Sequence, residues 1–293
     1  MIKKESLVKK AAYLRIASAD LAEGMKSGNF RSLYKGQGIE FSGVRDYIRG
    51  DDVRSIDWNV TARMGRPYVK VFEEERELQI FIIVDNSFSM QLANDSYTKY
   101  EASAEAAALL SIAAELNGCP VGAVFFDGAI YFSCAPKLGR EQTMLILNHL
   151  DKGPKENIKG SVLESALKVT GKLLRKRSLV FIFSDFRSSH WEDSLISLAQ
   201  KNDVVAFRMW NSFDEQLPQI GYAPFTDCES DLVMHLPTTS SQLKKEWRLQ
   251  NESNTKQWQT LCLKHGVVPI VFKTTDEPFQ VLNAVFDRKR FAK

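Results

Sequence analysis

An acid and two hydroxyl side chains alternate directly after an apolar run in the first third of the chain. Asp85, Ser87 and Ser89 follow the run LQIFIIV at 78–84. Because alternate residues of an extended chain point the same way, the three oxygen-bearing side chains should leave the run together. Oxygen is the donor that hard divalent cations prefer, so this spacing makes the segment a candidate for metal binding.

Two further oxygen donors stand at comparable positions later in the chain. Asp185 follows a second apolar run, SLVFIFS at 178–184, and Ser161 lies at the start of a helix predicted between the two runs. Mg²⁺, or alternatively Mn²⁺ or Ca²⁺, accepts hydroxyl ligands directly while carboxylates bind its waters. Neutral direct ligands leave the ion electrophilic, so an Asp or Glu of a partner protein can complete its shell. The predicted direct ligands are Ser87, Ser89 and Ser161, and the predicted water-binding acids are Asp85 and Asp185.

Each of these residues also has an ordinary structural interpretation. Ser87 and Ser89 could cap the turn after the first run. Ser161 could be a helix N-cap, with Glu164 completing a capping box, and Asp185 could accept backbone hydrogen bonds. For one residue alone these roles are favoured. The joint placement after two strands and at a helix start favours a metal site instead.

Apolar runs bounded by turn signals alternate with helical patterns from about residue 75 onward, which is typical of a parallel sheet. The predicted strands cover 78–84, 121–126, 130–134, 178–184, 203–210 and 267–273, with a tight hairpin at Asp127 and Gly128. The predicted helices cover 99–117, 140–150, 161–176, 191–201, 239–265 and 278–290. We therefore expect an α/β, Rossmann-like fold, a mostly parallel sheet with helices on both faces. Ligands of such sheets collect beyond the carboxyl ends of the strands.

The amino-terminal part of the chain has a different pattern. Residues 4 to about 26 have helical periodicity, 32–66 are rich in glycine, arginine and aspartate and predict loops, and 68–72 predict an exposed strand. The predicted boundaries are 1–74 for this helical and loop-rich extension, 75–236 for the α/β domain, and 237–293 for helices and a strand that pack on it.

Charged residues of both signs crowd into the extension with a tryptophan among them. Bidentate Arg to Asp pairs could clip the extension onto the α/β domain, with Trp58 as a packing anchor. The same residues could instead form a recognition surface, because Arg and Trp are frequent at binding hot spots. The sequence favours the structural interpretation. The residues that recognition would use are Arg45, Asp46, Arg49, Asp57 and Trp58.

Composition limits the classes of partner. The chain has 39 basic and 36 acidic residues, and a net charge of +3 spread over its length is too weak to imply nucleic acid. No segment approaches the roughly 20 apolar residues that span a bilayer, and the first residues do not resemble a secretory signal. We therefore expect a cytoplasmic protein. The four cysteines are far apart, which predicts reduced thiols rather than a zinc site: Cys119, Cys134, Cys228 and Cys262.

The pattern Asp-x-Ser-x-Ser after an apolar strand resembles the metal-ion-dependent adhesion site of von Willebrand factor A-type domains, and Asp85, Ser87 and Ser89 match it without a gap. From about residue 20 to the end, the chain also resembles the bacterial family called domain-of-unknown-function family 58. The stretches that carry this resemblance are IEFSGVRDYIRGDDVRSIDWNVTAR, RPYVKVFEEEREL, KYEASAEAAALL, VGAVFFD, FIFSDF and LPQIGYAPFTDCESD.

The resemblance implies a non-enzymatic adaptor that works with a MoxR-type AAA+ ATPase in protein remodelling or maturation. A-type domains commonly offer Thr, often followed by Asp, where this chain has Ser161 and Val162. The hydroxyl is retained, but the acid that would support it is not.

Two other classes of function remain open. A metal-dependent hydrolase would use the ion to activate water, but it normally needs a base. Only His190 lies close to a candidate ligand in the sequence, and a helix-start or packing role is favoured for it. A scaffold with a vestigial metal site is the other alternative, and metal binding would separate it from the adaptor.

Overall fold

The structure is a computed structural model of the chain, and it describes residues 18, 35–75, 78–91, 97–154, 158, 160–217, 221–226 and 233–286. The helix predicted at 4–26 lies outside these residues, apart from Ser18. Ser18 is helical, and its Oγ donates a hydrogen bond to the carbonyl oxygen of Leu109. Cys228 also lies outside the described part.

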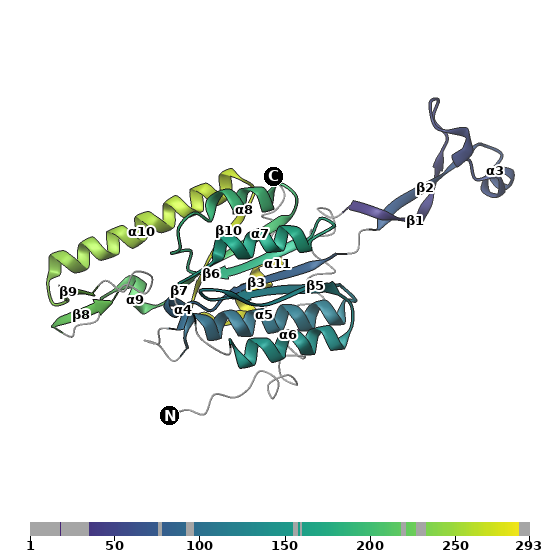
Figure 1. Cartoon of the computed structure of the whole chain (residues 1–293). Coiled ribbons are helices and arrows are strands. Elements are labelled where there is room, and N and C mark those ends of the chain that lie inside the picture. Colours follow the sequence, from purple (N-terminus) through teal and green to yellow (C-terminus); the bar gives the residue numbers. More distant parts are fainter. Residues whose placement is uncertain are drawn as a thin grey trace.

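A six-stranded sheet forms the centre of the molecule (Figure 1). Its strand order is β10-β7-β6-β3-β4-β5; β5 runs antiparallel to β4, and the other neighbouring pairs are parallel. The strands are β3 (Ile80–Asp85), β4 (Val121–Phe126), β5 (Ile130–Lys137), β6 (Leu179–Ser184), β7 (Asp203–Trp210) and β10 (Val268–Lys273). The predicted α/β fold with a mostly parallel sheet is confirmed.

Helices cover both faces of this sheet. One face packs against α5 (Lys99–Leu116), α6 (Arg140–Lys152) and α11 (Pro278–Phe286). The other packs against α7 (Leu163–Leu173), α8 (Glu192–Ala199) and α10 (Ser241–Lys264). Two short helices, α4 (Phe88–Gln91) and α9 (Ser212–Glu215), follow β3 and β7 at the carboxyl end of the sheet. No helix among the described residues combines the length and apolar character that crossing a membrane requires.

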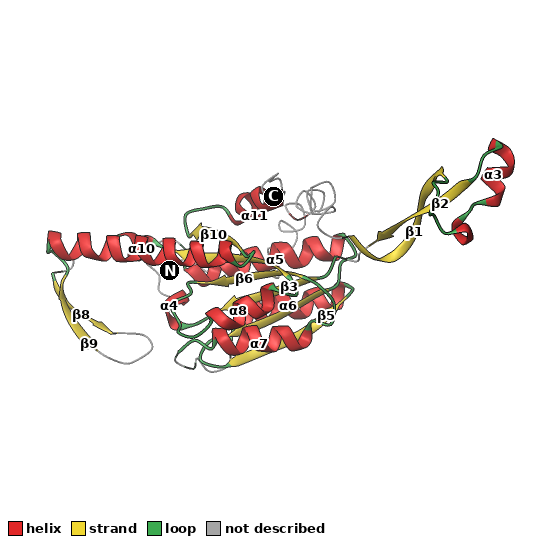
Figure 2. Ribbon diagram, turned by 90° about the horizontal axis from the view of Figure 1, so that it is seen from above, coloured by secondary structure: helices red, strands yellow, loops and turns green. Residues whose placement is uncertain are grey.

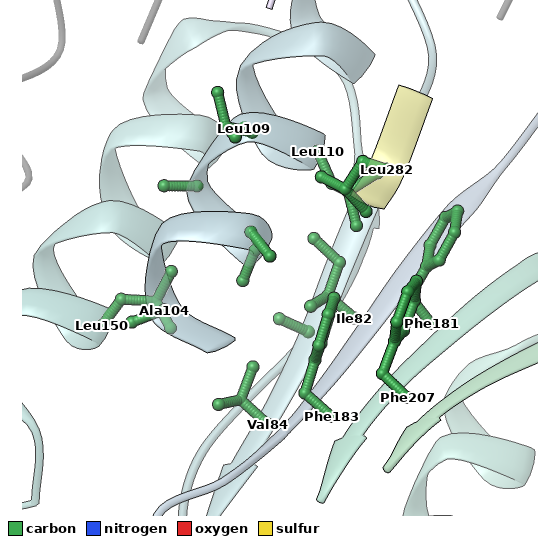
Figure 3. Packing of buried hydrophobic residues seen from close by; sticks show 14 of the residues in the cluster. Ile82, Val84, Ala104, Leu109, Leu110, Leu150, Phe181, Phe183, Phe207 and Leu282 are labelled. Carbon is green, nitrogen blue, oxygen red and sulfur yellow. The ribbon is translucent and has the colours of Figure 1, made fainter. Parts of the chain in front are cut away.

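The central strands are buried on both faces, which is why they are continuous apolar runs in the sequence. Along β3, Ile82 and Val84 face the core beneath α5, and Phe81 and Ile83 face the opposite core, as alternate residues of a strand must. Figure 3 shows Ile82 and Val84 beside α5, whose row of alanines lets the helix lie close to the sheet. This packing fixes the positions of the strand ends.

The extension forms an antiparallel pair, β1 (Lys35–Asp46) and β2 (Tyr68–Glu75), joined by η1 (Val53–Ser55) and α3 (Trp58–Met64). We call residues 35–75 the arm. Figure 1 shows it projecting from the amino-terminal end of β3. The prediction of loops over 32–66 is therefore wrong for β1 and α3. Glycines and two register shifts interrupt the alternation by which a strand is recognised, between Lys35 and Gly38 and between Phe41 and Gly43.

The carboxy-terminal part also contributes to the sheet, because β10 pairs with β7 at its edge. A second antiparallel hairpin, β8 (Tyr222–Thr226) with β9 (Val233–Pro237), precedes α10 and is absent from the sequence-based prediction. The two views in Figures 1 and 2 agree that the arm and this hairpin lie at opposite ends of the molecule.

Candidate metal centre at the strand ends

The five predicted ligand residues come together at the carboxyl edge of the sheet, which we call the rim. Asp85 is the last residue of β3, and Asp185 directly follows β6. Because β3 and β6 are adjacent and parallel, with Val84 opposite Phe183, the two acids leave the sheet side by side. Both are buried.

Hydrogen bonds from three separate segments hold the Asp85 carboxylate. Its Oδ1 accepts from the backbone N–H of Ser87 at 2.8 Å. Its Oδ2 accepts from Ser184 Oγ at 2.7 Å and from Ser161 Oγ at 3.3 Å. The rim is therefore assembled by tertiary structure and not by one local turn.

The three serine hydroxyls face the two carboxylates. Ser87 Oγ and Ser89 Oγ lie 3.2 Å apart, and the Ser89 hydroxyl is close enough to Asp185 to help lower the pKa of that acid. Asp185 also accepts a backbone hydrogen bond at Oδ1, from Arg187 at 3.3 Å. Five oxygen-bearing side chains thus converge, which is the donor chemistry that a hard cation requires.

The capping-box interpretation of Ser161 is wrong. The N-cap of α7 is Val162, which makes no side-chain cap hydrogen bond. Glu164 pairs instead with Lys168, one turn further along the same helix. The hydroxyl of Ser161 is turned toward Asp85. It therefore does not cap α7, and it contributes a hydrogen bond to the rim instead.

Asp127, at the end of β4, positions the loop that carries Ser161. This buried acid accepts from the backbone N–H of Ala129 at 2.8 Å and from that of Ile158 at 3.1 Å. Its carbonyl oxygen accepts from the N–H of Val162 at 3.0 Å. The residue predicted only as part of a hairpin therefore also fixes the segment before α7, and its place at a parallel strand end is the signal that could have identified it.

Burial and proximity act differently on the two acids. Burial, and next the neighbouring Asp185, raise the pKa of Asp85 to about 7. Burial would raise the pKa of Asp185 as well, but the positive charges of Lys99 and Arg187 hold it below the usual aspartate value. Of the two acids, Asp185 is therefore the one that stays ionised near neutral pH. A cation at the rim would favour ionisation of Asp85 as well.

A buried ion-pair network that the sequence analysis missed adjoins the rim. Lys99 Nζ lies 2.9 Å from Asp214 Oδ2 and 3.6 Å from Asp185 Oδ2, and these three side chains are only 3–5% exposed. Arg187 also pairs with Asp214. Asp214 follows β7, so a search of every parallel strand end would have found it, whereas Lys99 is marked only by being the first residue of an alanine-rich helix.

The oxygens at the rim fit a hard cation. Asp185 Oδ2 is buried and accepts no hydrogen bond among the described residues, although Lys99 Nζ lies 3.6 Å and Arg187 Nε 3.8 Å from it, so a water of a bound ion could still hydrogen-bond this oxygen. Within the described part of the chain, no group of three or more His, Cys, Asp or Glu side chains could hold a metal. Zinc chemistry is therefore poorly served there, whereas two carboxylates with three hydroxyls suit Mg²⁺, Mn²⁺ or Ca²⁺.

The backbone after Asp185 is unusual. Phe186 has a φ of 54° and His190 a φ of 62°, a left-handed region that non-glycine residues seldom occupy. Phe186 is held by packing against Trp191 and Trp258 and by donating its N–H to Ser184 Oγ at 3.1 Å. His190 is exposed, so the packing role is wrong. It lies one residue before Trp191, the N-cap of α8, and therefore stands at the start of that helix, as the other favoured role expects.

The predicted recognition residues all lie on the arm. Arg45 makes a bidentate pair with Asp51, both contacts at 2.7 Å, and its hydrogen bond is the main reason that the pKa of Asp51 falls to about 2. Asp57 caps α3, and Trp58 is 66% exposed. The pairing closes the arm on itself, and the structural interpretation with Trp58 as a packing anchor is wrong. The others, Asp46 and Arg49, are exposed at the start of the β1–η1 connection.

Comparison with known proteins identifies one matching family and several relatives. The model of the family described as "Protein of unknown function DUF58" matches residues 43–257. An uncharacterized protein of Mycobacterium bovis and two of Mycobacterium tuberculosis are each 29% identical over 214 residues, which is 72% of this chain and 67% of theirs.

Two solved structures show weaker likenesses. An aerotolerance-related membrane protein from Bacteroides fragilis has a TM-score of 0.47 and 13% identity, covering 71% of this chain and 96% of its own. Proximal thread matrix protein 1 from the mussel byssus has a TM-score of 0.42 and 13% identity, covering 72% of this chain and 46% of its own. Likeness at this level carries no information about activity.

Proposed function

From the premise that this chain belongs to the DUF58 family, we propose that it is a non-enzymatic adaptor that binds a partner protein through a divalent cation at the rim. Ser87, Ser89 and Ser161 would ligate the ion, and Asp85 and Asp185 would hold its waters. The bound ion would supply the attraction for a partner carboxylate. The observation that carries the proposal is the hydrogen bond from Ser161 Oγ to Asp85 Oδ2, which joins residues 76 positions apart.

Exposed apolar side chains next to the rim support protein binding. Phe88, between the two candidate serine ligands, is 56% exposed, and Ile158, on the loop before Ser161, is 50% exposed. Tyr97, two residues before Lys99, is 39% exposed. Apolar side chains around a polar centre are the arrangement that protein interfaces use.

The assignment of an A-type domain and of a MoxR-type AAA+ ATPase as partner is part of the same proposal. Its support is the Asp-x-Ser-x-Ser stretch at 85–89, placed at the carboxyl end of a parallel strand. The arm offers a second surface for such a partner, because Trp58 is exposed there. The arm joins β3 at its amino-terminal end, so the two surfaces lie at opposite ends of that strand.

Direct measurement of cation binding tests the proposal. Mn²⁺, as a paramagnetic probe, is titrated into the wild-type protein and into the double variant Ser87→Ala with Ser89→Ala. We expect the wild type to bind one ion per chain and the double variant to lose this binding while keeping its circular dichroism spectrum. Ser133→Ala, which removes an exposed hydroxyl from β5, is the matched control and should bind as the wild type does. Equal binding by the double variant would contradict the proposal.

A scaffold with a vestigial metal site is a second candidate, and one observation favours it. Lys99 Nζ, 3.6 Å from Asp185 Oδ2, already places a positive charge beside the rim. A pull-down with the purified MoxR-type ATPase of the same cell, run in Mg²⁺ and in EDTA, separates the two candidates. Binding only in Mg²⁺ and only without the Asp85→Ala change supports the adaptor, whereas identical recovery in every lane supports the scaffold.

The hydrolase alternative gains no supporting observation. His190 is the base that a hydrolase mechanism would use. It is exposed, and its own backbone is in the strained left-handed region. Among the described residues, no hydrogen bond joins it to Asp85 or Asp185. Phosphatase or peptidase turnover with Mg²⁺ or Mn²⁺, abolished by Asp85→Ala, would be needed to revive it.

A further inference from the structure

A lysine side chain is enclosed beside the candidate metal centre. Lys99 is the first residue of α5, and its side chain is only 3% exposed between Asp214 and Asp185. We propose that Lys99 is a positioning residue that sets the cation affinity of the rim. Its ion pair with Asp214 holds the ammonium group beyond hydrogen-bonding distance of Asp185. This inference rests on the proposed function and names the regulation of that site.

The distances place the ammonium group on one acid and near the other. Nζ is 2.9 Å from Asp214 Oδ2, within hydrogen-bonding distance, and 3.6 Å from Asp185 Oδ2, beyond it. Asp185 Oδ2 therefore stays without a hydrogen bond among the described residues, even though the ammonium group of Lys99 and, at 3.8 Å, the guanidinium group of Arg187 lie beside it. The Asp185 oxygen is left available to another group, such as a water of a bound ion.

Asp214 is held rigidly in the place where it retains the lysine. Its Oδ2 accepts from the backbone N–H of Asn211 at 2.8 Å, as part of the capping box that begins α9. Its Oδ1 accepts from the guanidinium group of Arg187, and its carbonyl oxygen accepts from Asn251 Nδ2 at 3.1 Å. Because these three groups fix Asp214, the lysine bound to it has a defined distance from Asp185.

The charge of Lys99 acts strongly because water is excluded. Two charges a few ångströms apart interact far more strongly in a protein interior than at a surface, where water and salt screen them. The ammonium group of Lys99 therefore reduces the attraction of Asp185 for a metal ion.

A weak cation site has a functional consequence. The positive charge of Lys99 offsets part of the negative charge at the rim, and a partner carboxylate restores negative charge there. The partner and the ion therefore each raise the affinity of the rim for the other. The rim would then hold its ion firmly only in the complex. Lys99 makes metal binding conditional on the partner, and so makes the adaptor reversible.

Two substitutions test the inference because they shift affinity in opposite directions. Lys99→Gln removes the charge but keeps a donor for Asp214, and we expect the affinity for Mn²⁺ to rise by about tenfold or more. Asp214→Asn frees the ammonium group to move onto Asp185, and we expect the affinity to fall by about tenfold or more. Lys168→Met removes an exposed lysine from α7 and should leave the affinity unchanged.

A merely structural role for Lys99 predicts a different pattern. In that case both rim variants would bind Mn²⁺ more weakly, in proportion to their loss of thermal stability, and the inference would be overturned. Lys99→Arg keeps the charge, so after correction for any loss of thermal stability it should bind within about twofold of the wild type. If Lys99→Gln does not fold, Asp214→Asn and Lys99→Arg are compared after correction for thermal stability: lower affinity in Asp214→Asn alone supports the inference, and equal affinities overturn it.

The experiment distinguishes failure of this inference from failure of the proposed function. Binding by the wild type with no change in Lys99→Gln overturns the inference alone. Binding by Lys99→Gln but not by the wild type supports the inference and shows that the lysine replaces the ion in the resting protein. Absence of binding in the wild type and in Lys99→Gln overturns both.

Discussion

The rim and the arm both gather acids and bases into a small space, but they use them differently. At the rim, Lys99, Asp185 and Asp214 are almost completely buried. On the arm, the side chain of Arg45 is 47% exposed and that of Asp51 is 20% exposed. Buried charges depend on one another because each is costly without its partner. Exposed pairs contribute little, because water solvates each member alone.

The two regions also differ in how far their contacts reach along the chain. The hydrogen bonds to Asp85 from Ser161 and Ser184 join residues 76 and 99 positions apart. Arg45 and Asp51 are six positions apart. The rim therefore forms only when the central sheet has formed, whereas the Arg45–Asp51 pair and the pairing of β1 with β2 both lie within residues 35–75. We infer that the rim is present only in the folded protein and that the sequence of the arm can change without disturbing the rim.

The largest expected effect is on stability at the rim. Asp214→Ala leaves Lys99 buried beside Asp185 alone and removes a partner from Arg187, which should cost about 3–5 kcal/mol of unfolding free energy. Asp51→Asn on the arm should leave the urea midpoint of the α/β domain unchanged. Urea denaturation followed by tryptophan fluorescence measures both variants. Similar midpoints for the two would show that burial does not distinguish the two regions.

The regions should also respond to pH with opposite sign, which is the next largest effect. The pKa of Asp85 rises to about 7 in the fold, so without a cation this acid favours folding most at low pH, and that contribution falls as the pH rises from about 4 to 7. The pKa of Asp51 falls to about 2, so its contribution is present above about pH 4 and is lost toward pH 2.

Cation binding makes this pH dependence measurable at the rim. Because the ion must displace one proton from Asp85, the apparent affinity for Mn²⁺ should fall about tenfold for each pH unit below 7 and level off above it. Titrations at several pH values measure this slope. A flat profile would mean that Asp85 is already ionised in the metal-free protein, and would remove the contrast with the arm.

The same contrast between local and long-range contacts decides which parts of the structure the sequence predicts. The strands β3, β6 and β7 were predictable because buried parallel strands are continuous apolar runs. Asp85, Ser87 and Ser89 were found because they are close in sequence and follow such a run. Ser161 and Asp185 required the additional rule that strand ends of a parallel sheet meet at one edge.

The parts that sequence reasoning missed have physical reasons. The strand β1 has the sequence pattern of a loop, because glycines and bulges break its alternation. The pairing of Lys99 with Asp214 has no signal in the sequence because four strands, β4 to β7, separate the helices that carry the two residues, and only the folded sheet brings them together. Buried ion pairs have no local pattern. The crowded charges of the arm do predict Arg to Asp pairing, but as a clip onto the α/β domain, whereas Arg45 pairs with Asp51 inside the arm.

The smallest effect on stability is expected for the tryptophan of the arm. Trp58 is 66% exposed, so Trp58→Ala removes little buried surface and should leave the urea midpoint of the protein unchanged. If the arm is a recognition surface, the same change should weaken capture of the MoxR-type ATPase about tenfold or more, because exposed tryptophans at interfaces are frequent hot spots. Surface plasmon resonance with the purified ATPase, in Mg²⁺ and in EDTA, measures this. Leu138→Ala, which removes an exposed apolar side chain at the end of β5, is the matched control. Loss of capture by Trp58→Ala in both buffers would make the arm a contact independent of the ion at the rim, whereas full capture would confine recognition to the rim.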